Sequence, residues 1–259
     1  MTNLELGIVA PALLASLIVL ATHVPLGIEV LRRGIIFIDL AIAQVAGLGV
    51  IAADSMGWEA EGWMVQVAAV SAALLAAFIL RWTDKRWPEI QEALIGVSFV
   101  LAATAGILVL AGNPHGGEHL KELLVGQVLW VNLGQLLPAA IVSALVLAGW
   151  YVFRERLRGF VFYALFAFAV TVSVQLVGIY LVFASLIIPA LSTRKIARRG
   201  FRVLCGYGVG IVGSLAGLIL SVTADLPAGA VIVWCLAITA LLFAYLVRPL
   251  IAAGGLRDT

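Results

Sequence analysis

Long apolar segments alternate with short polar connections along almost the whole chain, and most of these segments are near 20 residues long. A helix needs about 20 residues to cross roughly 30 Å of hydrocarbon. The apolar segments span residues 6–31, 35–53, 62–82, 90–111, 134–153, 160–177, 180–193, 201–223 and 227–247. Because backbone amides and carbonyls must find partners inside lipid, helices are expected. The pattern predicts an all-α, polytopic transmembrane bundle of eight or nine helices in a single domain, residues 1–259.

Basic residues divide the connections into two groups. Fifteen of the sixteen Lys and Arg residues stand at alternate ends of the apolar segments, and Lys121 is the exception. The clusters are Arg32/Arg33, Arg81/Lys85/Arg86, Arg154/Arg156/Arg158, Arg194/Lys195/Arg198/Arg199/Arg202 and Arg248/Arg257. The positive-inside rule makes these connections cytoplasmic. We therefore expect the N-terminus outside and the C-terminus inside, with acidic residues such as Asp54 and Asp225 on the outer face.

Composition agrees with a membrane protein. Hydrophobic residues make up 63% of the chain, charged residues only 12%, and the mean hydropathy is +1.14, whereas soluble domains are about 25% charged. Within 259 residues this leaves no room for a separate soluble catalytic domain, so we expect no enzyme. The net charge of +2 gives no reason to expect nucleic acid, because the basic residues follow the topology.

The segment 160–193 presents a topological problem. About 34 apolar residues lie between two clusters that are both predicted to be cytoplasmic, so a single helix would leave Arg194 on the wrong side. We expect a break near Gln175–Gly178 and a short second crossing. Short or broken helices often border a transport path.

The connection 112–133 is longer than the others. Asn113-Pro114 and Gly116-Gly117 are typical of a turn. From His119 the spacing becomes helical, with an apolar face made of Leu120, Leu123, Leu124, Val128 and Val131. We expect a short helix at the membrane surface rather than a crossing, with Trp130 at the boundary.

The same connection carries a candidate metal site. His115, Glu118 and His119 stand at i, i+3 and i+4, which in a helix places them on one face. Imidazole and carboxylate suit zinc and other divalent first-row ions. The alternative is a solvated polar loop. Because no fourth ligand is evident, a capture or handover site fits the sequence better than a closed structural zinc site.

Polar residues inside the apolar segments are the other candidates, because charges in the membrane are costly and by default functional. Asp39 is followed by Gln44 and by small residues that leave space for a path. Asp39 is either a transient cation ligand or a capping carboxylate at a helix start. His23, two residues before Pro25, is either a ligand or a partner for backbone groups freed at the proline. Glu29 is expected near Arg32 and Arg33.

Two further patterns concern packing and energy supply. The stripe Gly206, Gly210, Gly213 and Gly217 predicts close helix–helix contact. No Gly-Lys dipeptide occurs, which excludes a P-loop of the GxxxxGK[ST] kind. If ATP drives this protein, another chain binds the nucleotide.

Four stretches together carry a resemblance to a known family. They are LRRGIIFIDLAIAQVAGLG (Leu31–Gly49), LVGQVLWV (Leu124–Val131), VGIYLVFASLIIPALSTR (Val177–Arg194) and DLPAG (Asp225–Gly229). Over almost its whole length the chain resembles the permease subunits of bacterial zinc/manganese ABC importers, which are related in plan to cobalamin and siderophore importers.

The resemblance implies a multi-pass permease in the bacterial inner (cytoplasmic) membrane. Two permease copies, identical in the simplest case, would enclose a central path. A cytoplasmic ABC ATPase would drive transport, and a periplasmic or surface-anchored binding protein would deliver the metal. Zn²⁺, or Mn²⁺ or Fe²⁺, would be the transported substrate, with no permanently bound cofactor.

The resemblance also assigns residues. Asp39 matches an Asp of the family's metal path, but the His that usually follows four residues later is missing, and Gln44, five residues on, is the nearest polar group. Arg154, Glu155, Arg156 and Gly159 match a shortened ATPase-coupling segment. The histidine-bearing outer loop is not a general family feature, and it favours zinc over manganese or iron.

The sequence thus predicts the membrane subunit of an ATP-driven divalent-metal importer. The alternative is a secondary cation/proton transporter that works alone. Such a transporter is expected to carry several mid-membrane acids in corresponding halves of the chain, and Asp39 stands near one end without a clear inverted repeat.

Overall fold

The computed structural model describes residues 3–58, 62–111, 113, 116–153 and 159–247, and every regular element in these ranges is helical. The α-helices are α1 (Asn3–Arg33), α2 (Ile38–Ser55), α3 (Trp63–Arg86), α4 (Gln91–Leu110), α5 (Gly116–Val125), α6 (Leu133–Val152), α7 (Phe160–Val177), α8 (Ile179–Ser192), α9 (Arg199–Ala224) and α10 (Ala228–Leu242). Short turns of other helix types are η1 (Pro88–Ile90), η2 (Val128–Trp130) and η3 (Phe243–Val247). Eight of the described helices are long and apolar enough to cross a membrane, and α8 is shorter, at 14 residues. The predicted all-α bundle is confirmed.

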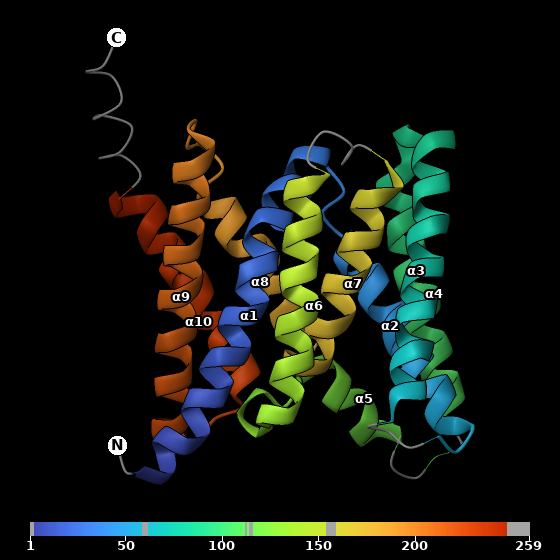
Figure 1. The fold of residues 1–259 in the computed structure, drawn as a ribbon, viewed down its shortest axis with the longest axis horizontal. Helices are drawn as coiled ribbons and strands as arrows, with labels where there is room; N and C mark the ends of the chain where they lie inside the picture. Colours follow the sequence, from blue (N-terminus) through green and yellow to red (C-terminus); the bar gives the residue numbers. More distant parts are fainter. Residues whose placement is uncertain (1–2, 59–61, 112, 114–115, 154–158, 248–259) are drawn as a thin grey trace.

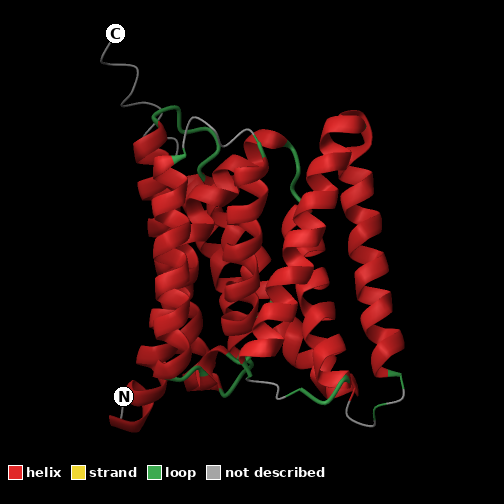
Figure 2. Cartoon of the chain, turned by 45° about the vertical axis from the view of Figure 1, so that its right-hand side comes forward, coloured by secondary structure: helices red, strands yellow, loops and turns green. Residues whose placement is uncertain are grey.

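The long helices lie side by side between two ends of the molecule (Figures 1 and 2). At one end α1 and α3 finish and α7 and α9 begin, which brings Arg33, Arg86 and Arg199 to the same end; we call it the basic end. At the other, the acidic end, α2 and α9 finish near Asp54 and Asp225, and α5 lies across the bundle. That the basic end is cytoplasmic stays a prediction.

Helix α7 forms the centre of the bundle and packs against α1, α2, α3, α6 and α8. Its side chains Phe162, Tyr163 and Phe166 are among the largest that are fully buried. The long apolar stretch is interrupted at Gly178, which has φ +80° and separates α7 from α8. The predicted break is therefore confirmed, and it falls on a glycine, the residue that adopts a positive φ most easily.

The glycine stripe of α9 packs against two helices. Added Cβ atoms at Gly206 and Gly210 would press into side chains of α1, and at Gly213 and Gly217 into the backbone of α10. The prediction of close helix contact is confirmed. The spacing i, i+4, i+7 and i+11 keeps the four glycines on one face of α9, and α1 packs against the first two while α10 packs against the last two.

The predicted surface helix exists, but its bounds were wrong. Helix α5 begins at Gly116, three residues before His119, and ends at Val125. Val128 lies beyond it in a separate 3₁₀ turn, and Trp130 in that turn is 75% exposed. The helix ends early because the chain turns sharply at Gly126, which has φ +71°.

Candidate functional site

Asp39 lies in the first turn of α2, at a point where the chain has just turned. Helix α1 ends at Arg33, Gly34 takes φ +72°, and α2 begins at Ile38. Asp39 is 0% exposed, and neither carboxylate oxygen has a hydrogen-bond partner in the described structure. The residue at the N-cap position is Phe37, and Asp39 caps nothing. The capping interpretation of Asp39 was therefore wrong.

A buried carboxylate without a partner is costly, because it loses hydration and gains no compensating bond. Asp39 shares its side of α2 with Ala43 and Ala46, both buried and small. Such a group accepts a cation or a proton readily, since either one removes the uncompensated charge. Such a carboxylate is compatible with weak binding of a single cation, and that Asp39 is a metal ligand stays a prediction.

Gln44 is also buried, at 8% exposure. It stands five residues after Asp39, which corresponds to about 140° around an α-helix, so the two side chains leave α2 in different directions. The structure does not bring them together as a pair of ligands. Across the described ranges, no group of three His, Cys, Asp or Glu side chains is close enough to hold a metal ion.

His23 is fully buried in α1, and its Nδ1 donates to the Val19 carbonyl at 2.9 Å. Its Nε2 has no hydrogen-bond partner among the residues that the structure describes. Pro25 lacks an amide hydrogen and so frees the carbonyl of Ala21, but the Tyr207 hydroxyl of α9 donates to that carbonyl at 2.8 Å. Tyr207 therefore satisfies the carbonyl that the proline frees, while His23 bonds to the Val19 carbonyl, one turn before His23 itself. That His23 is a metal ligand stays a prediction.

At the basic end, Glu29 lies between two arginines, as expected. Its carboxylate accepts from Arg32 at 2.5 and 2.9 Å and from Arg33 at 2.9 Å. The Arg33 guanidinium carbon lies 3.9 Å from the centroid of the Phe162 ring. Glu29 thus holds Arg33 over an aromatic ring of α7, where cation–π attraction adds to the ion pair.

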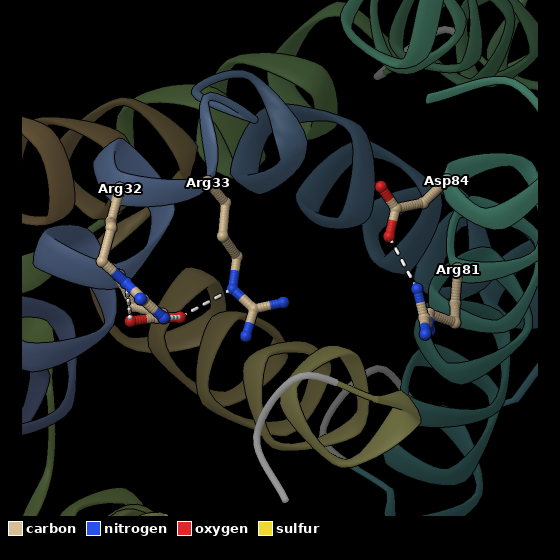
Figure 3. A network of polar contacts seen from close by, with 5 residues as sticks. Arg32, Arg33, Arg81 and Asp84 are labelled. Carbon is tan, nitrogen blue, oxygen red and sulfur yellow. Dashed lines mark hydrogen bonds and ion pairs between the residues drawn. The ribbon is translucent and has the colours of Figure 1, made fainter. Parts of the chain in front are cut away.

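A second arginine approaches α7 from α3. Arg81 donates to Asp84 at 2.7 Å, and its guanidinium carbon lies 6.0 Å from the Tyr163 ring centroid. Figure 3 shows the two arrangements side by side, with Arg33 on α1 and the Arg81–Asp84 pair on α3. We call Arg33, Phe162, Tyr163 and Arg81 the arginine–aromatic layer. It links α1, α7 and α3 through side chains, and sequence reasoning missed its two aromatic members.

At the acidic end, segments that are distant in the sequence contact one another through backbone atoms. A Cβ at Gly126 would overlap the backbone of Val177 and Gly178, one at Gly178 would overlap Gly126, and one at Gly229 would overlap the Val125 carbonyl. We call Gly126, Gly178 and Gly229 the three-glycine junction. One glycine comes from each of three of the stretches that carry the family resemblance, so those distant stretches meet at one place.

The outer-loop metal candidates remain predictions. His115 lies outside the described residues. Glu118 is exposed in the first turn of α5, and His119 follows it in the helix. The backbone therefore places Glu118 and His119 on a surface helix at the acidic end, which is compatible with capture of an ion from solution.

The coupling candidates also remain predictions. Arg154, Glu155 and Arg156 lie outside the described residues. Gly159 immediately precedes α7 in an extended conformation, at the basic end of the bundle. Any contact made by this segment would act directly on the central helix.

Comparison with known proteins gives relatives over most of the chain. The chain is 25% identical over 228 residues to the manganese transport system membrane protein MntC of Halalkalibacterium halodurans, covering 80% of this chain and 76% of that protein. It is 25% identical over 253 residues to the high-affinity zinc uptake system membrane protein ZnuB of Haemophilus influenzae, covering 88% and 93%.

The fold is found in solved structures as well. A chain of PsaBC from Streptococcus pneumoniae in complex with Fab superposes with a TM-score of 0.75 and 21% identity, covering 92% of this chain and 91% of that chain. The sequence pattern of the ABC 3 transport family matches residues 5–162 and 154–248. These two overlapping matches span nearly the whole sequence, and the chain therefore belongs to the ABC 3 transport family.

Proposed function

We propose that this chain is the permease subunit of an ATP-driven importer of divalent metal ions. The observation that carries the proposal is Asp39, a fully buried carboxylate without a hydrogen-bond partner in the first turn of α2. Membership of the ABC 3 transport family supports it. Relatives named for manganese transport and for zinc uptake support the choice of a metal as cargo.

In this proposal Asp39 is a transient ligand. A single carboxylate binds a passing cation weakly, and weak binding favours rapid release into the cytoplasm. Two permease copies, as a homodimer in the inner membrane, would rock about a central path and expose Asp39 to each side in turn. A cytoplasmic ABC ATPase would supply the free energy at the basic end, through Arg154–Gly159. A binding protein would deliver the ion at the acidic end.

The proposed cargo is zinc. His115, Glu118 and His119 supply the imidazole and carboxylate ligands that zinc prefers, and their connection leads into α5 at the acidic end. Manganese is the second candidate, because the polar groups of α2, Asp39 and Gln44, offer only oxygen donors, which suit manganese better.

A stand-alone secondary transporter is the rival mechanism. It would use the same buried carboxylate to carry a proton in exchange for a cation. Family membership favours the ATP-driven mechanism, and the dependence of uptake on ATP or on a proton gradient separates the two.

The test is metal uptake into proteoliposomes that contain this chain with its ATPase and a metal-loaded binding protein. We expect ATP-dependent uptake of radioactive zinc, reduced at least about tenfold by Asp39→Asn, because intramembrane charges usually mark the transport path. Asp54→Asn, at the other end of α2, is the matched control and should leave uptake unchanged. Uptake that follows a proton gradient without ATP would refute the proposal. Uptake of manganese but not zinc would overturn only the choice of cargo.

A further inference from the structure

Helix α2 has no cap of its own. The first amides of a helix lack partners within it and are usually capped by nearby side chains. Helix α6 follows this rule, because Asn132 and Gln135 bond to each other's backbone amides in a capping box. At α2 the N-cap residue is Phe37, whose side chain accepts nothing.

The missing cap comes from another helix. Glu92, in the first turn of α4, accepts a hydrogen bond from the Phe37 amide at 3.2 Å through Oε1. In a capping box, the side chain three residues after the N-cap makes this contact. The residue at that position in α2 is Leu40, which has no acceptor. Glu92 therefore takes the place of the N3 side chain of a capping box, from 55 residues away in the sequence.

Phe37 is held from a second side. Its ring stacks on Phe183 of α8, with centroids 6.4 Å apart and planes 9° from parallel. The residue two positions before Asp39 is thus attached to α4 through its amide and to α8 through its ring. Because the Asp39 carboxylate has no hydrogen-bond partner among the described residues, its position depends on the backbone at the start of α2 and on the side chains packed around it.

Glu92 also differs from two other acids of the basic end, Glu29 and Asp84. Glu29 and Asp84 each accept from arginines, whereas Glu92 Oε1 bonds to a backbone amide and Oε2 is buried without a partner. Among the described residues, Glu92 therefore forms no ion pair. Its single described contact is with the start of the helix that carries Asp39.

We propose that Glu92 is the positioning residue for Asp39, holding the first turn of α2 so that the buried carboxylate faces the passing cation. The inference rests on the proposed function for Asp39, but the cap itself is measurable without transport.

The transport test uses the full complex and three variants. Glu92→Ala removes the acceptor and should raise the zinc concentration at half-maximal uptake about fivefold, the size expected for one lost cap. The maximal rate should stay within about twofold, because the Asp39 carboxylate itself is retained. Glu92→Gln keeps an acceptor oxygen and should restore the wild-type value. Glu89→Ala, an exposed acid just before α4, is the matched control and should change nothing.

Hydrogen exchange of residues 34–41 measures the cap directly. The segment should exchange faster in Glu92→Ala and at the wild-type rate in Glu92→Gln. In an Asp39→Asn background, Glu92→Ala should have no further effect on uptake, because the two residues act through one site. If Glu92→Ala does not accumulate, Glu92→Asp, which is one methylene shorter, takes its place with the same expectations.

Several results would overturn the inference. The first is an unchanged zinc concentration at half-maximal uptake in Glu92→Ala. The second is a further loss of uptake when Glu92→Ala is added to Asp39→Asn, as large as the loss that Glu92→Ala causes alone. The third is a half-maximal zinc concentration in Glu92→Gln that stays as high as in Glu92→Ala, which would mean that the charge of Glu92 matters rather than its capping bond. Absence of metal uptake by the wild-type complex would instead refute the proposed function. Exchange data would then still decide whether Glu92 caps α2.

Discussion

The two ends of the bundle are joined by different kinds of contact. At the acidic end, the three-glycine junction brings backbone against backbone at Gly126, Gly178 and Gly229. At the basic end, the arginine–aromatic layer links helices through long side chains, with Arg33 over Phe162. A backbone contact has no rotamers to change, so its partners move together or separate completely. A side-chain layer rearranges by rotation about side-chain bonds, which makes the basic end the easier one to open.

The largest effect is expected from Gly178→Ala. The new Cβ would meet the backbone of Gly126, and φ +80° is itself unfavourable for alanine. Neither backbone can yield without moving α5 or α8, so we expect a loss of at least about 3 kcal/mol in the free energy of unfolding, or no folded protein. Thermal unfolding in detergent measures this. Gly208→Ala on α9, where the added methyl meets open space, is the control. An unfolding temperature equal to that of the wild type for Gly178→Ala would show that Gly178 is not in tight backbone contact with Gly126.

Phe162→Ala tests the arginine–aromatic layer at the basic end. The ring is 0% exposed and packs against Tyr163, Phe166 and Trp150. We expect a loss of about 3 kcal/mol in the free energy of unfolding from the cavity alone. The bundle should still fold, because the surrounding side chains can partly fill the space. Phe162→Leu, which keeps most of the volume, should lose less than half as much. Equal losses for the two variants would indicate that aromatic contact, rather than volume, holds the layer.

The smallest effect is expected from Arg81→Gln. Its ion pair with Asp84 is partly exposed, and its guanidinium is 6.0 Å from the Tyr163 ring. Such pairs contribute about 0.2–1 kcal/mol, so the unfolding temperature should change little. If the layer closes the basic end, the variant should nevertheless increase the labelling of a cysteine introduced in place of Ala167, which is fully buried on α7 one turn beyond Tyr163. Unchanged labelling would show that Arg81 does not help to close that end.

Much of the fold could be predicted from the sequence, because it follows from the lengths of the apolar segments and from the positions of the basic residues between them. Apolar segments near 20 residues long and the alternation of basic clusters predicted the bundle. The topological argument predicted a break near Gln175–Gly178, and the structure has it at Gly178. The start of α5 was missed, because Gly116 and Gly117 resemble a turn and yet belong to the helix.

The site was predicted less completely, because its decisive contacts are distant in sequence. Asp39 was identified as a buried acid, but its lack of any partner depends on the surrounding helices. Glu92 lies 55 residues from Phe37, and Tyr207 lies 186 residues from Ala21. No local pattern links such pairs, so a single sequence cannot reveal them.

The bond from Tyr207 to the Ala21 carbonyl has an evolutionary consequence. The hydroxyl replaces the amide that Pro25 lacks, so the two positions depend on each other although they lie on different helices. In a relative with alanine at position 25, the amide of that alanine would donate to the carbonyl of residue 21, as in a regular helix. Such a relative would have no need of a hydroxyl at position 207. Tyrosine at 207 and proline at 25 are therefore expected to be gained and lost together as this lineage diverges.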